Sequence, residues 1–401
     1  MINLQEIKEA KQRLDGIVRN TPMAYAPILS AKNQANIYLK KENLQLTGSF
    51  KLRGAFNKIA TLNDDERSKG VVAASAGNHA QGLAFSAKHF NCDATIVMPE
   101  ATPLTKVSGV KSYGANVVLH GANYDEAYAY ATTYAKKNNK TFVHPFADDN
   151  VICGQGTVSL EIFEEIKDVD VLIIPIGGGG LISGMAVAAK SINPDIKIVG
   201  VVASGARAMK ESFEAKKPID SETVRTIADG IAVRDITPKM LDYVLKFVDE
   251  IIEVEDNEIA SAILFLLEKH KLVVEGAGAT GTAAIMHNKI DLKGKTVVLP
   301  LSGGNIDVTM LAQIIEKGLV KSSRKMNLIV TLIDKPGSLK MLTQIFEDLS
   351  ANIVQIDYDR DSVALDFGDA NVTIALETKG DEHQENIRQS LVSAGYRFSQ
   401  L

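Results

Sequence analysis

The chain has 401 residues, more than one ordinary domain needs, and this length suits two or three domains. Apolar residues make up 45% and charged residues 23%, a composition of folded globular proteins that excludes a disordered chain. The formal net charge is −5 and no long run of Lys or Arg is present, which argues against nucleic acid as a partner.

The N-terminal segment 1–16 predicts an amphipathic helix and lacks the apolar core of a signal peptide. No apolar run approaches the roughly 18–20 residues that cross a bilayer. Two cysteines, Cys92 and Cys153, are too few for a disulfide framework, and histidines such as His144 share no metal-ligand spacing. We therefore expect a cytoplasmic protein with no metal site and no membrane partner.

From about residue 36 to 310, short apolar segments alternate with helical patterns such as 79–89 and 181–191. Strands rich in Val and Ile, separated by helices, predict parallel sheets that are covered on both faces. In such sheets, ligands bind at the turns that follow the strands. The predicted strands are 36–40, 70–74, 94–98, 116–119, 141–143, 169–176, 196–202 and 295–301.

The first unusual turn is 47–55, TGSFKLRGA. A lone lysine is usually a solvated surface charge, but Gly48 and Gly54 flank Lys51 and Phe50 adjoins it. A lysine in a dry pocket has a lowered pKa and can react with an aldehyde, and an aromatic neighbour can cover a flat ring. Lys51 is therefore a candidate nucleophile.

The second turn is 73–82, AASAGNHAQG, in which a strand ends and a helix begins. Ser75 as a simple helix N-cap is one interpretation. The other is a site where backbone N–H groups and the side chains of Ser75 and Asn78 bind a carboxylate.

In the third turn, an apolar strand ends at Ile176, four glycines follow, and an apolar helix begins at Leu181. Without Cβ atoms, consecutive N–H groups can converge on an anion at a helix N-terminus. A tight turn is the alternative, but four glycines would then cost chain entropy for no gain. The pattern is neither GxGxxG nor a P-loop, so a dehydrogenase or NTPase is not favoured.

A fourth turn, LPLSGGN, places Ser302 and two glycines after another strand. Four such turns, one of them with Lys51, predict a single pocket.

The pattern changes near 319–325 (LVKSSRK). Beyond it we predict strand 327–334, helix 338–351, strands 352–359 and 371–378, helix 381–395 and strand 396–401. This order is the ferredoxin-like βαββαβ unit. We expect a catalytic domain at 1–320, with a smaller subdomain of about 47–150 inserted in the larger one, a linker at 321–326 and a C-terminal domain at 327–401.

The motifs GSFKLRGA, ASAGNHAQG, PIGGGGLISG, TIADGIAV and LPLSGGN, in this order, resemble those of the threonine and serine dehydratases. These are fold-type II pyridoxal-phosphate enzymes, α/β proteins similar to the tryptophan synthase β subunit, with two parallel-sheet subdomains. The tail, from TLIDKPGSL onward, resembles an ACT regulatory domain. The resemblance implies pyridoxal 5'-phosphate as cofactor and the conversion of L-threonine to 2-oxobutanoate and ammonia, with L-serine secondary, in isoleucine biosynthesis.

The resemblance also implies roles for individual residues. Lys51 would bind the cofactor covalently and take the Cα proton, and Glu275 would be an acid near the pocket. Ring contacts would come from Phe50, Gly230, Asn78 (to the ring hydroxyl) and Ser302 (to the pyridine nitrogen). The phosphate would lie on Gly177, Gly178, Gly179, Gly180 and Leu181. The substrate carboxylate would lie on Ser75, Ala76, Gly77, Asn78 and His79, the last through its backbone.

Two departures separate the chain from relatives of the same fold. Racemases carry a serine where this chain has Ala76, so racemisation is disfavoured. The stretch 202–208 has no carboxylate, so no divalent cation site is expected there, although backbone carbonyls can hold a monovalent ion. A serine dehydratase or racemase, a cysteine synthase (whose motifs differ) and a catalytically silent amino-acid sensor are the alternatives.

In the tail, paired ACT domains would bind an amino acid, isoleucine or valine, at their seam. The walls would be Asp334, Pro336, Gly337, Ser338 and Leu339 with Asn352 and Ile353. The alternative is an oligomerisation module without a ligand, and we expect a homodimer or homotetramer.

Overall fold

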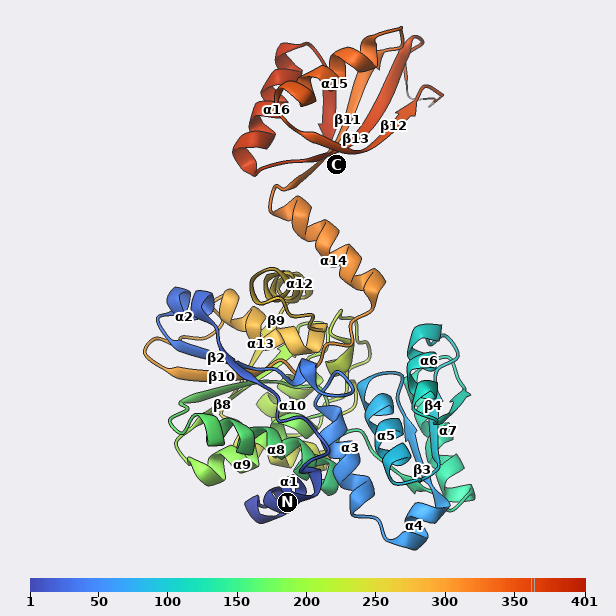
Figure 1. Cartoon of the computed structure of the whole chain (residues 1–401), viewed down its shortest axis with the longest axis vertical. Helices are drawn as coiled ribbons and strands as arrows, with labels where there is room; N and C mark the ends of the chain where they lie inside the picture. The colour runs from blue at the N-terminus through green and yellow to red at the C-terminus, as the bar shows by residue number, and fades with distance from the viewer. Residues whose placement is uncertain (362, 364) are drawn as a thin grey trace. The chain divides into compact units, whose positions relative to one another are not determined.

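The computed structural model describes residues 1–361, 363 and 365–401 and contains two compact units, Met1–Ile306 and Asp307–Leu401 (Figure 1). Each of the eight strands predicted for the first unit is present, with ends within two residues of those predicted. Two short strands that were not predicted, β1 (Met23–Tyr25) and β9 (Glu250–Val254), lie at the edges of the larger sheet. Within the described part of the chain, none of the helices combines the length and the hydrophobicity that a bilayer-spanning segment needs.

The larger sheet of the first unit has six strands, and only β1 runs antiparallel to its neighbour. Its strands in spatial order are β1 (Met23–Tyr25), β2 (Asn36–Lys40), β10 (Thr296–Pro300), β7 (Val171–Pro175), β8 (Lys197–Ala203) and β9 (Glu250–Val254).

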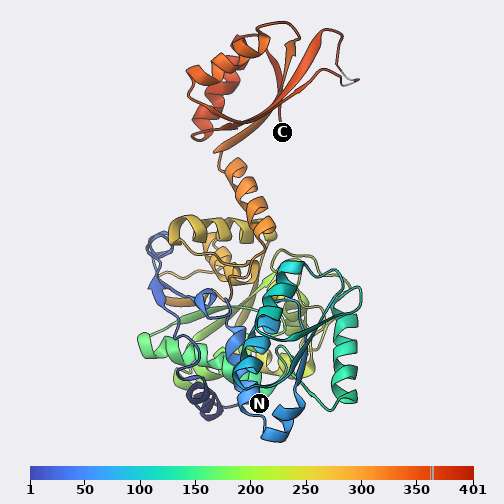
Figure 2. The same ribbon diagram turned by 45° about the vertical axis from the view of Figure 1, so that its right-hand side comes forward.

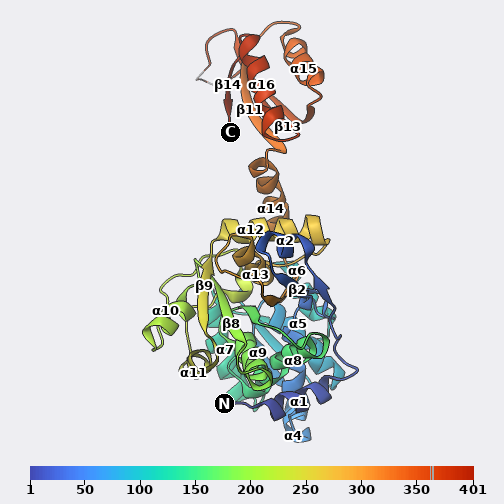
Figure 3. The same ribbon diagram turned by 90° about the vertical axis from the view of Figure 1, so that its left-hand side faces the viewer.

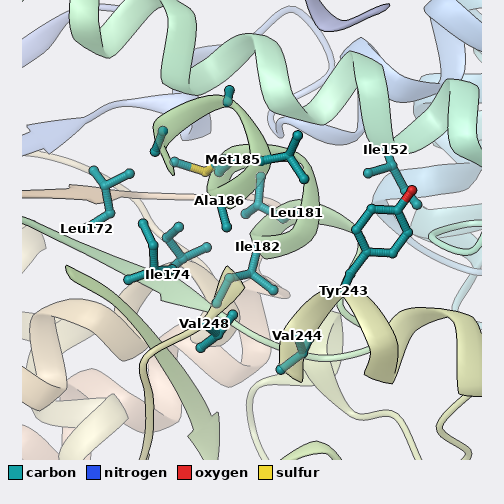
Figure 4. Packing of buried hydrophobic residues seen from close by; sticks show 14 of the residues in the cluster. Ile152, Leu172, Ile174, Leu181, Ile182, Met185, Ala186, Tyr243, Val244 and Val248 are labelled. Carbon is teal, nitrogen blue, oxygen red and sulfur yellow. The ribbon is translucent and has the colours of Figure 1, made fainter. Parts of the chain in front are cut away.

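Helices cover both faces of this sheet, with α8 (Asp149–Glu165) and α9 (Gly180–Ile192) on one side and α13 (Gly276–Met286) on the other (Figures 1 and 3). Leu172 and Ile174, alternate residues of β7, belong to the same buried cluster as the apolar side chains of α9 (Figure 4). The parallel sheet is thus buried on both faces, as the continuous apolar strands predicted.

The smaller sheet has four parallel strands and forms a subdomain with its own helices (Figure 2). Its order is β5 (Asn116–Leu119), β4 (Ala94–Met98), β3 (Val71–Ala74) and β6 (Thr141–Phe142). Val71 and Ala73 pack toward α5 (Asn78–His89), whereas Val72 and Ala74 pack toward α7 (Tyr124–Lys137), because successive strand residues point to opposite faces.

Helix α3 (Lys51–Ala60) packs closely on α8. A Cβ on Gly154 would lie 2.6 Å from the Cα of Gly54, so the two backbones approach closely only because both residues are glycine. The remaining elements of this unit are α1 (Leu4–Leu14), α2 (Pro27–Asn33), η1 (Glu42–Leu44), α4 (Asp64–Lys69), α6 (Leu104–Ser112), α10 (Ala208–Ala215), η2 (Asp229–Ile231), α11 (Pro238–Phe247), α12 (Asp256–Phe265) and η3 (Leu266–His270).

The C-terminal unit begins with α14 (Val308–Lys321), and the predicted linker at 321–326 is shortened, since Lys321 ends that helix and the next strand starts at Lys325. The βαββαβ order is then present, as β11 (Lys325–Ile333), α15 (Ser338–Asp348), β12 (Asn352–Asp359), β13 (Asp369–Glu377), α16 (Asp381–Ser393) and β14 (Arg397–Gln400). The sheet is antiparallel, in the order β12-β13-β11-β14. Alternate residues of β11 are buried with Leu342, Phe346 and Ile387, so this unit has its own core.

Candidate active site

Lys51 is the first residue of α3, and its side chain is partly buried. Its Nζ donates to the Pro145 carbonyl at 3.1 Å and lies 5.4 Å from the centroid of the Phe50 ring. Burial lowers the pKa of Lys51 to about 8, and the nearby Glu275 carboxylate opposes this shift. An amine with this pKa is partly unprotonated near neutral pH and can act as a nucleophile or a base.

Glu275 immediately precedes α13 and is buried. Both of its carboxylate oxygens accept from Asn78 Nδ2, at 2.7 and 3.0 Å. Burial raises the pKa of Glu275 to about 7, although the Asn78 hydrogen bonds and the Lys51 charge lower it. The site therefore holds an acid and a base whose pKa values are displaced toward each other, which is typical of catalytic pockets.

Both ends of the Asn78 amide have protein partners, although an amide oxygen with one partner can accept a second hydrogen bond. Its Oδ1 accepts from Asn305 Nδ2 at 2.6 Å, and the same Asn305 amide donates to the Thr47 carbonyl at 2.9 Å. The sequence did not single out Asn305, although it directly follows the two glycines of the fourth motif. Asn305 joins three of the motifs, since Thr47, Asn78 and Asn305 come from different turns.

The four glycines lie where β7 ends and α9 begins, and Gly179 has a φ of +90°. Cβ atoms on Gly178 and Gly180 would lie 2.5 and 2.8 Å from Phe146, and one on Gly177 would lie 2.8 Å from Ile231. These positions require glycine because the neighbours approach so closely. A glycine loop at the N-terminus of a 13-residue helix has the features that a bound phosphate requires.

The substrate-loop candidates lie between β3 and α5. Ser75 Oγ accepts from the N–H groups of Gly77 and Ala80 at 3.2 and 3.3 Å, while α5 begins at Asn78 with Gly77 at its N-cap position. Ser75 therefore does not occupy the N-cap position, because Ala76 and Gly77 lie between it and the helix. Its hydroxyl nevertheless accepts from the N–H of Ala80, the third residue of α5, as a capping side chain does. Ala76 lies beside it in the same loop.

The His79 side chain is buried, and its Nε2 lies 3.0 Å from the Val143 carbonyl. Burial and the Lys51 charge lower the pKa of His79 to about 3, so the ring stays neutral and donates to that carbonyl. The side chain thus anchors the segment before α8, which the sequence did not indicate.

Ser302 is buried after β10, and its carbonyl accepts from the Phe50 N–H at 3.1 Å. Gly303 is bridged to Ser49, and a Cβ on Gly303 would overlap Glu275 Oε1. Gly230, in η2, also faces Glu275, whose Oε1 would lie 3.3 Å from a Cβ there. The four motifs and the TIADGIAV segment therefore meet around Lys51 and Glu275.

Two residues after Lys51, the Arg53 guanidinium is fully buried between two carboxylates. It donates to both oxygens of Glu42 at 2.8 Å and to Glu161, which also pairs with Lys40 Nζ at 2.7 Å. This buried ionic cluster fixes α3 against β2 and α8.

The effector candidates lie in the C-terminal unit, but the sheet separates them. The Asp334 carboxylate accepts from the Tyr358 hydroxyl at 2.9 Å, at the end of β11, and Gly337 caps α15 with a φ of +91°. Asn352, by contrast, pairs with Glu377, which pairs with Lys325 at the other end of β11. Within one chain, Asn352 and Ile353 therefore lie at the opposite end of the sheet from the 334–339 loop, because β12 runs parallel to β11. The site expected from the sequence lies between two paired domains, so it stays a prediction.

A model of the family described as "Pyridoxal-phosphate dependent enzyme" matches residues 14–303. The L-threonine ammonia-lyase of Thermotoga maritima is 49% identical over 396 residues, which are 99% of this chain and 98% of that one.

Among solved structures, threonine deaminase isoform 2 from Solanum lycopersicum has a TM-score of 0.74 at 36% identity and covers 78% of this chain and 86% of its own. Maize serine racemase has a TM-score of 0.75 at 35% identity and covers 80% of this chain and 98% of its own. With its Lys51 turn and glycine loop inside the matched region, this chain belongs to the pyridoxal-phosphate dependent enzyme family.

Proposed function

We propose that this protein is an L-threonine ammonia-lyase that converts L-threonine to 2-oxobutanoate and ammonia, with L-serine as a slower substrate. The observation that carries the proposal is the position of Lys51, whose amino group contacts the Pro145 carbonyl, next to the Phe146 ring that packs on the glycine loop. The Thermotoga relative, matched along almost its whole length, supports threonine as the substrate.

The residues fit the cofactor, since the glycine loop is a cradle that Cβ atoms would fill. Pyridoxal phosphate supplies an aldehyde that binds amines covalently and a ring that accepts electrons from the substrate Cα. We assign its phosphate to Gly177–Leu181, one ring face to Phe50 with Gly230 near the opposite face, the ring hydroxyl to Asn78 and the pyridine nitrogen to Ser302. A neutral serine at that nitrogen favours prompt loss of the β-hydroxyl over transamination.

Lys51 performs the proton transfers in this proposal. Its lowered pKa allows the amine to take the Cα proton near neutral pH and to return a proton to the departing hydroxyl. The loop 75–79 binds the substrate carboxylate through its N–H groups and small polar side chains.

Racemisation is the second candidate, because maize serine racemase has a similar structure. The residue that decides between the two is Ala76, since a methyl group cannot exchange a proton on the face opposite Lys51. We therefore favour elimination.

The test is to incubate the purified protein with L-threonine and with L-serine and to measure 2-oxobutanoate, pyruvate and D-serine. We expect 2-oxobutanoate, and Lys51→Ala should reduce its formation by at least about a thousandfold while the fold is retained. D-serine without 2-oxobutanoate would favour the racemase, and full activity of Lys51→Ala would refute the role of this lysine.

For the C-terminal unit, we propose an ACT-type regulatory domain in a cytoplasmic homodimer or homotetramer that serves isoleucine biosynthesis. The βαββαβ order and the glycine-capped turn before α15 support this assignment. Isoleucine or valine would bind where the 334–339 loop of one copy meets Asn352 and Ile353 of another. A kinetic screen of the common amino acids tests the proposal, and no response to any of them would favour a purely structural role.

A further inference from the structure

The segment between β6 and α8 makes a turn, residues 143–148, that His144 organises. His144 Nδ1 accepts from the backbone N–H groups of Ala147 at 3.0 Å and Phe146 at 3.3 Å. An imidazole nitrogen that accepts two N–H groups must be unprotonated, so the ring is neutral with its proton on Nε2. The side chain thus folds its own backbone into a turn, as Asn and Asp side chains do elsewhere.

This turn contacts both chemical parts of the candidate site. The carbonyl of Pro145, the residue after His144, accepts from Lys51 Nζ at 3.1 Å. The ring of the following residue, Phe146, lies against Gly178 and Gly180 of the glycine loop. The turn therefore binds Lys51 through the Pro145 carbonyl and supports the glycine loop through the Phe146 ring.

We propose that His144 is a positioning residue: by accepting the Phe146 and Ala147 N–H groups, it holds the turn that aims the Lys51 amine and braces the glycine loop. The inference rests on the proposed role of Lys51 and adds to it a residue that acts through its own turn, since the contacts of His144 are the Phe146 and Ala147 N–H groups and neighbouring aromatic rings.

The surroundings keep His144 in the form that the turn requires. Its ring contacts the Phe146 ring at 4.5 Å between centroids, and the rings of Tyr128 and Phe142 at 5.8 and 6.3 Å. Burial lowers the pKa of His144 to about 4, and the Lys51 and Lys239 charges add to this while Asp148 opposes it. At neutral pH the ring therefore remains an acceptor.

Two amide variants separate this role from simple packing. In His144→Asn the side-chain oxygen takes the place of Nδ1 and can accept the same N–H groups. In His144→Gln the amide reaches only the place of Nε2, and His144→Leu removes the acceptor. His120→Leu is the matched control, because His120 is an exposed histidine of the same subdomain that packs on a tyrosine.

The readout is the capture of pyridoxal phosphate by apoprotein, followed by absorbance and fixed with borohydride, as a function of pH. The pH at which capture is half-maximal, the midpoint of this profile, reports the pKa of the Lys51 amine. We expect it to rise by roughly one unit or more in His144→Leu and His144→Gln, because an opened turn rehydrates the amine, and to stay near the wild-type value in His144→Asn. Cofactor release should be at least about tenfold faster in His144→Leu and His144→Gln, because the Phe146 ring no longer supports the glycine loop.

Unchanged capture and release in His144→Leu would overturn the proposal, and so would an Asn variant as impaired as the Gln variant. If the Leu variant does not fold, the comparison of Asn with Gln decides alone. Lys51→Ala is measured in parallel, since cofactor capture that borohydride still fixes in that variant would refute the role of Lys51, on which the proposed function rests, and not the role of His144 alone.

Discussion

At the scale of single residues, the site depends on two ionisable groups whose burial shifts their pKa values in opposite directions. Lys51 has a pKa of about 8 and Glu275 one of about 7, and each charge favours the ionised form of the other. Lys51 was predictable because its glycine and aromatic neighbours are visible in the sequence. The hydrogen bond from Lys51 to the Pro145 carbonyl could not be predicted from the sequence. Every residue has a backbone carbonyl, so this contact leaves no pattern in the sequence.

The first prediction concerns Glu275→Gln. In the folded apoprotein Glu275 keeps its proton up to about pH 7, whereas in the unfolded chain it loses it near 4.5. The folded state thus binds more protons between these values, so this residue makes the free energy of unfolding fall as pH rises from about 4.5 to 7. In Glu275→Gln that decline should be smaller. Urea unfolding at several pH values measures it, and identical pH profiles of the two proteins would contradict the shift.

The second prediction concerns Gly303→Ala, whose Cβ would overlap Glu275 Oε1. Displacing that carboxylate breaks its contacts with Asn78, so threonine deamination should fall by at least about tenfold. Gly109→Ala is the control, because a Cβ at this helical glycine meets nothing within 4 Å, and its activity should be unchanged. Steady-state kinetics of both variants make the comparison. Equal activities would show that the reaction does not depend on the exact position of the Glu275 carboxylate.

At the scale of elements, α3 carries Lys51 and is held by the buried cluster around Arg53. The sequence placed the central strands well, because parallel strands buried on both faces are continuous apolar runs. It missed β9, an edge strand in which partly exposed Glu250 and Glu253 interrupt the apolar pattern. The Arg53 cluster was also not predicted, since Glu42 and Glu161 come from distant segments and only the fold brings them together.

The third prediction is that Arg53→Met strongly destabilises the protein. It leaves two buried carboxylates without their shared cation, which should cost about 3–5 kcal/mol of the free energy of unfolding. Lys69→Met breaks only an exposed pair with Asp65 and should cost less than about 1 kcal/mol. Chemical denaturation of both variants tests this, and equal losses would argue that the cluster adds nothing beyond a surface ion pair.

At the scale of the whole molecule, the two units have separate cores, and the family model ends at residue 303, before the second unit begins. The βαββαβ order of that unit was predictable because its turns and alternating strands lie close together in the sequence. The separation of Asn352 from the 334–339 loop was not, since it depends on the direction in which β12 pairs.

The fourth prediction is that a chain ending at residue 322 keeps its threonine deaminase activity within about threefold, because the candidate site lies entirely in the first unit. Any response to isoleucine or valine should be lost. Initial rates with and without each amino acid, for the full and the shortened chain, measure both effects. A shortened protein that still responds would place the effector in the first unit.

The pairing of β12 with β13 has one more consequence. Because the two proposed walls of the effector site lie at opposite ends of one sheet, a ligand that uses both must bridge two copies of the chain. Its binding is then linked by mass action to self-association. Diluting the protein should weaken the apparent affinity for the amino acid, and adding the amino acid should drive dissociated chains back together.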